Sequence, residues 1–256
     1  VLTGPDFAHD TLNDPLPCTN QMIQFAGRPT KWYDVDLVTG QWTLRGTLSP
    51  AQAVNAIGYL GLDNYLYGYD QTANTLVRVA NDRTLMTLGR PAGLPAEDYQ
   101  AGAFDPDGFF YLYASGTNRF YTVDLRPDSA TFLKLVDPTA GYTEQTVTFG
   151  TPLSTAVEIH DWAFDPADGN LYGLQRSGVL TCISPLTGQV RSLNTAVSAP
   201  DAAFGAVALD STGRLYAIES NHGTIYRYTF SDNSAEGLPF SRTYFHSFHD
   251  GTLCPD

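Results

Sequence analysis

The stretch DWAFDPADGNLYGL, residues 161–174, shows the pattern that decides the fold. It consists of an apolar run, a turn rich in Asp, Pro and Gly, and a second apolar run with a Leu-Tyr pair. Two apolar runs joined by such a turn are typical of a β-hairpin. The pattern recurs in NAIGYLGLDNYLYGY (55–69), AGAFDPDGFFYLY (101–113) and GAVALDSTGRLYAI (205–218). The hairpin is therefore an internal repeat of the chain.

Each hairpin is followed by a third strand and by a weaker fourth strand. The third strands read TLVRV from Thr75, RFYTV from Arg119, VLTCI from Val179 and TIYRY from Thr224. Four strands in about 45 residues are the unit of a β-propeller blade. The four repeats therefore predict four blades.

The two ends of the chain supply a fifth blade. QMIQF from Gln21, KWYDV from Lys31 and GQWTLRG from Gly40 match the second, third and fourth strands, and HDGTLCPD from His249 matches the missing first strand. We therefore predict an all-β, five-bladed propeller with four-stranded blades, closed by pairing of the C-terminal strand with the N-terminal blade. Residues 1–17 are predicted to be an N-terminal extension, and 18–256 a single propeller domain.

The three cysteines bear on this closure. Cys18 and Cys254 flank the turn that is missing between the chain ends, so we predict a disulfide that replaces it. Such a bond implies an oxidising compartment. Cys182 falls on the polar side of its strand, where we expect a free, half-exposed and inert thiol.

The charge balance excludes two classes of partner. The 256 residues carry 27 Asp and Glu against 14 Lys and Arg, a net charge of −13. Nucleic-acid binding needs a basic surface, and so does attachment to an anionic membrane. No apolar run is long enough for membrane insertion. We therefore expect no nucleic acid and no membrane among the partners.

The motifs NAIGY with DNYLYG, DWAFDPADGNLYGL and the ending HDGTLCPD resemble an uncharacterised family of secreted or cell-surface proteins of bacteria and fungi. The domain of that family is a propeller-like unit without an assigned activity. The resemblance covers nearly the whole chain and implies a secreted, extracellular or cell-wall location. It implies no catalytic residues.

The first positions of the innermost strands converge on the axis of the ring, where propellers usually bind ligands. Two of them carry a His-Asp pair, His160 with Asp161 and His249 with Asp250. Imidazoles and carboxylates brought together suit Zn²⁺, or Ca²⁺ where only the oxygens engage, and such a pair also suits an oriented base. The alternative is that Asp161 and Asp250 hydrogen-bond to neighbouring backbone and shape the ring centre.

Other candidates for ligand binding are aromatic. The loop of residues 137–161 contains Tyr142, Glu144 and Phe149, which either line a pocket over the channel or belong to a purely structural flap. The tryptophans either stack on sugars or pack between blades: Trp32, Trp42 and Trp162.

These features favour a secreted, monomeric, non-enzymatic protein that binds carbohydrate or a cell-surface or matrix partner, because the chain has no recognisable catalytic motif. The alternative is a secreted hydrolase of glycosidic or ester bonds with carboxylates at the channel mouth. Its candidate residues are Glu158, Asp161 and Asp250, since such a reaction needs two carboxyl groups a few ångströms apart. A structural wall component without a small ligand is the third possibility.

Overall fold

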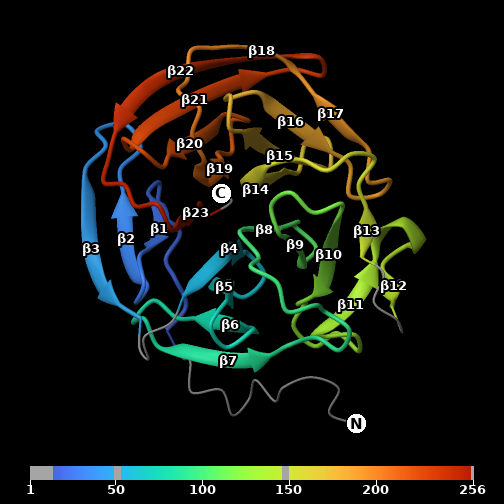
Figure 1. Cartoon of the computed structure of the whole chain (residues 1–256). Helices are drawn as coiled ribbons and strands as arrows, with labels where there is room; N and C mark the ends of the chain where they lie inside the picture. Colours follow the sequence, from blue (N-terminus) through green and yellow to red (C-terminus); the bar gives the residue numbers. More distant parts are fainter. Residues whose placement is uncertain (1–13, 49–52, 146–149, 255–256) are drawn as a thin grey trace.

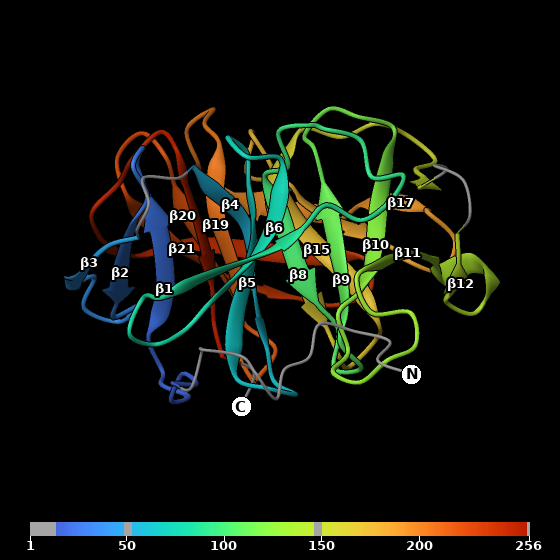
Figure 2. The same cartoon turned by 90° about the horizontal axis from the view of Figure 1, so that it is seen from below.

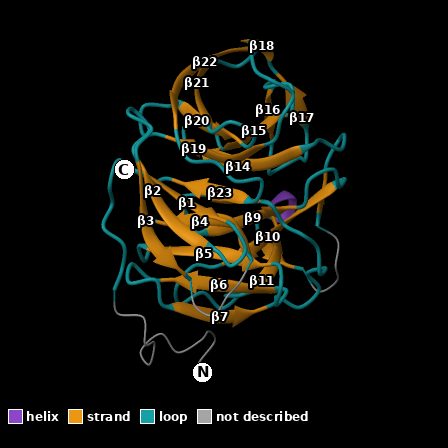
Figure 3. Ribbon diagram, turned by 60° about the vertical axis from the view of Figure 1, so that its left-hand side comes forward, coloured by secondary structure: helices purple, strands orange, loops and turns teal. Residues whose placement is uncertain are grey.

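The computed structural model describes residues 14–48, 53–145 and 150–254. Five β-sheets stand around a central axis like the blades of a propeller (Figure 1). The predicted all-β, five-bladed ring is confirmed. Within the described residues, helix is limited to the 3-10 turn η2 (Pro138–Ala140), purple in Figure 3. No helix among them has the length and apolar character that a membrane span requires.

Blade 1 is built from both ends of the chain. Its strands are, from the axis outward, β23 (His249–Thr252), β1 (Met22–Ala26), β2 (Lys31–Val35) and β3 (Trp42–Thr47). β23 pairs antiparallel with β1, and the predicted disulfide joins Cys18 to Cys254, whose Cα atoms are 5.4 Å apart. Because the bond spans 236 residues, the chain-entropy model assigns it about 5 kcal/mol of stabilisation.

Blades 2 and 4 have the four strands that the repeat predicts. Blade 2 consists of β4 (Val54–Leu60), β5 (Tyr65–Asp70), β6 (Thr75–Val79) and β7 (Leu85–Gly89). Blade 4 consists of β14 (Ile159–Asp165), β15 (Asn170–Gln175), β16 (Leu180–Ile183) and β17 (Val190–Ser192). The register shifts near the start of both innermost strands. Such bulges bend a strand and redirect its side chains, here at the axis.

Blades 3 and 5 carry strands beyond the predicted four. Blade 3 consists of β8 (Ala101–Phe104), β9 (Phe109–Tyr113), β10 (Arg119–Asp124) and β11 (Lys134–Asp137), with β12 (Thr143–Glu144) and β13 (Thr151–Pro152) added. Blade 5 consists of β19 (Phe204–Leu209), β20 (Leu215–Glu219), β21 (Thr224–Phe230) and β22 (Ser234–Arg242), with β18 (Asn194–Val197) added parallel to β22. The added strands come from segments between repeats, which the repeat pattern does not describe.

Aromatic side chains fill the spaces between blades. Trp32 and Trp162 are only 1% exposed, whereas Trp42 is 46% exposed. The Trp162 ring stacks on Tyr113 of blade 3, with 5.3 Å between centroids. Two of the three tryptophans thus pack in the core, as one of the two expectations had it, and only Trp42 presents its ring to solvent.

The long loop predicted to lie over the channel lies instead at the outer edge of blade 3, with β12 and β13 (Figure 1). The Tyr142 ring stacks on Phe109 at 3.9 Å, and its hydroxyl is 2.9 Å from that of Tyr111. Glu144 is exposed at the same edge, while Phe149 lies outside the described residues. The prediction of a pocket over the channel is wrong for Tyr142 and Glu144, because pairing of β12 with β11 holds the loop away from the axis.

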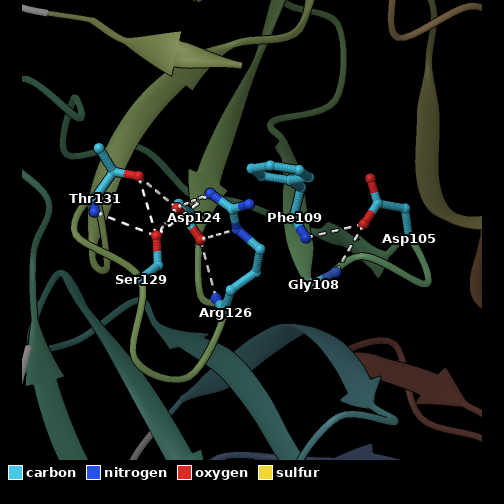
Figure 4. A network of polar contacts seen from close by, with 7 residues as sticks. All are labelled: Asp105, Gly108, Phe109, Asp124, Arg126, Ser129 and Thr131. Carbon is cyan, nitrogen blue, oxygen red and sulfur yellow. Dashed lines mark hydrogen bonds and ion pairs between the residues drawn. The ribbon is translucent and has the colours of Figure 1, made fainter. Parts of the chain in front are cut away.

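A polar network fixes the turn between β10 and β11 (Figure 4). The Asp124 carboxylate has no exposed surface and accepts hydrogen bonds from the Arg126 guanidinium at 2.7 and 2.9 Å. The hydroxyls of Ser129 and Thr131 donate to the same carboxylate. The Arg126 guanidinium lies 4.4 Å from the centre of the Phe109 ring. This network therefore anchors the face of blade 3 on which Tyr142 stacks.

Cys182 and Leu16 are both buried. Cys182 is a free thiol, as predicted, but it is 5% exposed and not half-exposed. The reason is that blade 5 packs against this face of β16; burial raises the pKa of the thiol, consistent with an inert cysteine. Leu16, in the predicted N-terminal extension, is buried and donates its N–H to the Asn64 carbonyl at 2.7 Å. The division at residue 17 stays a prediction.

Candidate functional site

Asp161 and Asp250 lie at the centre of the ring, and neither has exposed surface. Each carboxyl accepts the backbone N–H of the residue that follows it. Each also reaches the innermost strand of the next blade, where Asp161 accepts the Val207 N–H and Asp250 accepts the Ile57 N–H. The two side chains therefore join neighbouring blades through backbone hydrogen bonds, which is the structural alternative stated for them above.

The burial of this pair changes its protonation. Burial raises the pKa of Asp161 well above its usual range, and the neighbouring Asp250 raises it further. Burial raises the pKa of Asp250 to about 8. The pair therefore retains protons at neutral pH, since burial disfavours the anionic form of each carboxyl and adjacent carboxylates repel each other.

A polar cavity of about 160 Å³ opens at the mouth of the channel, on the face where the innermost strands begin. Its lining is dominated by neutral hydrogen-bonding groups with one cation and one carboxylate, and includes Arg28, Asn55, Gln71, Asp98, Gln100 and His160. His249 and Ser220 form the part nearest the core. The structure thus brings the two predicted histidines to one cavity and leaves the two predicted aspartates beneath it.

His249 is fixed from both sides of its ring. The Gln24 side-chain amide donates to Nδ1 at 2.8 Å, and Nε2 lies 2.8 Å from the Ser220 hydroxyl. Burial lowers the pKa of His249 to about 3, so the ring is neutral. A side chain at Gly205 would place its Cβ within 2.7 Å of this ring, so glycine is required there.

His160 is the accessible histidine of the cavity. It is half-buried, and burial lowers the pKa of its imidazole. None of the described residues forms a hydrogen bond with its ring. Its donor and acceptor nitrogens are therefore available to a ligand in the cavity.

The other predicted site residues lie elsewhere. Trp162 lines a smaller cavity of about 70 Å³ at the opposite end of the channel, beside Phe104 and Phe164. Glu158 is exposed and lines a depression shared with Arg176. A ligand at the channel mouth would therefore contact His160 and His249, but not Trp162.

Metal binding stays a prediction from the sequence. In the described ranges, no three His, Cys, Asp or Glu side chains are grouped so that they could hold a metal ion. Of the four candidate ligands, only His160 has unengaged nitrogens among the described residues, because both His249 nitrogens have partners and the Asp161 and Asp250 oxygens accept backbone N–H groups.

Several cavity residues escaped the sequence analysis. Arg28 comes from the β1–β2 turn, and Ser220 follows β20. Gln24, which holds His249 from within β1, does not itself line the cavity. The repeat pattern compares first strands with first strands, so it could not show that other segments reach the mouth. The usable signal was Arg28, a base in the turn between the second and third strands of the closing blade.

The model of a family described as a repeat of unknown function, DUF6923, matches residues 21–254. The chain belongs to this family. No curated protein matches this DUF6923 member. Family membership therefore supports the repeat organisation of the chain but assigns no activity to it.

Among solved structures, the DUF6923 chain is similar to virginiamycin B lyase from Staphylococcus aureus, with 14% identity, a TM-score of 0.50, and 81% of this chain and 62% of that chain covered. A chain of a nidogen/laminin complex is similar with 16% identity and a TM-score of 0.52, and 88% of this chain and 82% of that chain are covered. A protein of unknown function from Bacteroides thetaiotaomicron is similar with 10% identity and a TM-score of 0.55, and 92% of this chain and 62% of that chain are covered. The chain thus spans less than two thirds of the lyase chain. At these identities the similarity concerns the fold alone.

Proposed function

We propose that this protein is a secreted, non-enzymatic binding protein that holds a saccharide, free or on a cell surface or matrix, at the mouth of its central channel. The cavity there carries the proposal. Sugar hydroxyls both donate and accept hydrogen bonds, and the amides of Asn55, Gln71 and Gln100 do the same. The Cys18–Cys254 disulfide supports secretion, since such bonds persist in oxidising compartments.

The carboxyl groups argue against glycosidic hydrolysis as the function of this cavity. A glycosidase needs an acid and a second carboxylate on either side of the scissile bond. Asp161 and Asp250 have no exposed surface, and Glu158 does not line the mouth. Asp98 is the one carboxylate in the lining, so the second catalytic group is missing among the described residues.

Replacement of His160 tests the binding proposal. The variant His160→Ala removes the accessible imidazole and should weaken saccharide binding by about tenfold, because one hydrogen bond to a neutral group contributes about 1 kcal/mol and the emptied site adds to the loss. A glycan array should identify the saccharide, and isothermal titration should then compare the variants.

Glu158→Ala is the matched control, since it changes an exposed neighbour outside the cavity. Its affinity should equal that of the wild type. Binding that is unaffected by His160→Ala, or no binding to any glycan, would refute the proposal.

One contact favours ester hydrolysis as a second candidate. Ser220 and His249 lie at the distance of a nucleophile and its base. As the Gln24 amide is oriented, its N–H donates to Nδ1, so Nε2 carries the proton and the serine is not activated. Gln24 Oε1 is buried without a hydrogen-bond partner in the described chain. In the opposite amide orientation, this oxygen would accept a hydrogen bond from a protonated Nδ1, and the unprotonated Nε2 would be free to act as a base.

A serine-directed fluorophosphonate separates the two candidates. Stoichiometric labelling of Ser220, lost in Ser220→Ala, would support the esterase. The lowered pKa of His249 makes it a weak base, so we expect no labelling while saccharide binding persists.

A further inference from the structure

A second cavity, of about 120 Å³, adjoins the channel mouth on the same face. It lies between the β1–β2 turn and the segment that precedes β23, which are tied together by the Gly27 N–H and the Phe248 carbonyl at 2.9 Å. Its titratable lining consists of Arg28, Lys31 and His246 with the two phenols of Tyr33 and Tyr244, and it contains no carboxylate. The chain as a whole has a net charge of −13, whereas the charged side chains that line this cavity are basic.

Arg28 connects the two cavities, because it lines both. Its guanidinium lies 4.1 Å from the centre of the Phe248 ring, and one N–H donates to Gln71 Oε1 at 2.8 Å. These contacts hold the guanidinium plane, and no other described residue accepts from its remaining N–H donors. A planar fork of this kind suits a carboxylate or a sulfate.

The two lysines of the chain differ in their surroundings. Lys134 forms an ion pair with Glu144 at 2.8 Å. Lys31 is exposed at the start of β2, and no described carboxylate pairs with it. Its charge is therefore uncompensated at the edge of the cavity.

The remaining walls suit the faces and hydroxyls of a sugar. His246 Nδ1 accepts the Phe248 N–H at 3.1 Å, which leaves Nε2 free on the side of Gly27. Tyr244 packs against Tyr33 and the exposed Trp42, with 5.0 Å between ring centroids in both pairs. Aromatic rings at a solvent-facing edge offer apolar surface to a sugar ring.

We propose that Arg28, Lys31 and His246 form a subsite for the acid group of an anionic saccharide, whose neutral part occupies the channel mouth. This inference rests on the proposed saccharide binding and specifies the class of saccharide. Asp98 lines the mouth but not the second cavity. It disfavours an acid group within the mouth, so the charged unit is directed toward Lys31.

The test compares three trisaccharides of the same linkage, built from galacturonic acid, from galactose and from sulfated galactose. Isothermal titration in 50 mM salt should show the anionic trisaccharides binding at least tenfold more tightly than neutral galactose. The sulfated form separates sulfate from carboxylate as the preferred acid group. Raising the salt to 500 mM should remove most of the preference, since exposed charges are screened.

Lys31→Ala should reduce binding of the preferred anionic trisaccharide about fivefold and leave galactose binding unchanged. Lys134→Ala is the matched control, because it removes the other lysine from an exposed strand start, and it should change neither. Thermal unfolding of each variant confirms that it is folded.

Two results would overturn the inference, and they are distinguishable. Equal affinity for neutral and anionic trisaccharides, lost in His160→Ala but not in Lys31→Ala, would reject the acid subsite and keep the saccharide site. No binding of any trisaccharide would reject both.

Discussion

The axis of the ring and the outer edge of blade 3 both contain carboxyl groups with no exposed surface, yet these groups differ in charge. Burial raises the pKa of Asp124, but its hydrogen bonds from Arg126, Ser129 and Thr131 outweigh burial and lower the pKa below its usual range. Asp161 and Asp250 accept hydrogen bonds from backbone N–H groups and interact with each other, and burial raises the pKa values of both. Burial alone therefore does not set the charge of these acids; the balance between burial and the hydrogen bonds donated to each carboxyl does.

The largest expected effect follows from removing the charge at blade 3. Asp124→Asn should lower the free energy of unfolding by about 3 kcal/mol at pH 7, because it removes the charge that accepts hydrogen bonds from the partly exposed Arg126 and from two hydroxyls. Asp250→Asn should cost less at the same pH, since Asp250 already holds a proton. Urea denaturation of both variants measures the difference. Equal losses would mean that Asp250 is ionised and the contrast is mistaken.

The second effect is a pH dependence that originates at the axis. The folded pKa of Asp250, about 8, lies above its ordinary 3.8, so folding holds a proton that the unfolded chain releases. This stabilisation is complete in acid and is lost as the pH rises through 8. Between pH 6.5 and 8 the free energy of unfolding should fall by about 1 kcal/mol or more.

His160 and His249 oppose this fall only slightly, since their lowered pKa values add stability mainly as the pH rises toward 6.5. Asp250→Asn should remove about half of the slope, because Asp161 still titrates, whereas Asp124→Asn should leave the slope intact. A flat wild-type profile of stability between pH 6.5 and 8 would contradict the assignment.

The smallest effect concerns Tyr142. Tyr142→Phe removes the hydroxyl next to Tyr111 but keeps the stack on Phe109, so the loss of stability should be about 1 kcal/mol. Saccharide affinity should not change, because Tyr142 is remote from the mouth. Weaker binding in this variant would return the residue to the site that its sequence position first suggested.

The sequence predicted the ring well because the blade pattern is local and repeated. The Leu-Tyr strands, the turns between them and the two cysteines specify five blades and their closure without reference to distant contacts. The position of the 137–161 loop was not predictable in this way, since it depends on β12 pairing with β11. The burial of Cys182 likewise depends on the packing of the next blade.

The candidate site was predicted only in part. His160 and His249 were found because each opens an innermost strand. Arg28 and Ser220 were missed because they reach the mouth from other segments, whose approach depends on the curvature of the sheets. The roles of Asp161 and Asp250 could not be read from their spacing, since burial decides between a ligand site and a structural one.

The closure of blade 1 also determines how the molecule can be presented. β1 runs from the face of the Cys18–Cys254 bond to the face of the cavities (Figure 2). A tether joined beyond either cysteine therefore leaves from the face opposite the channel mouth. Immobilised through such a tether, on a sensor chip or on a larger scaffold, the propeller would turn its cavities outward. The disulfide that closes the ring thus marks one face for attachment and leaves the opposite face, with its cavities, accessible.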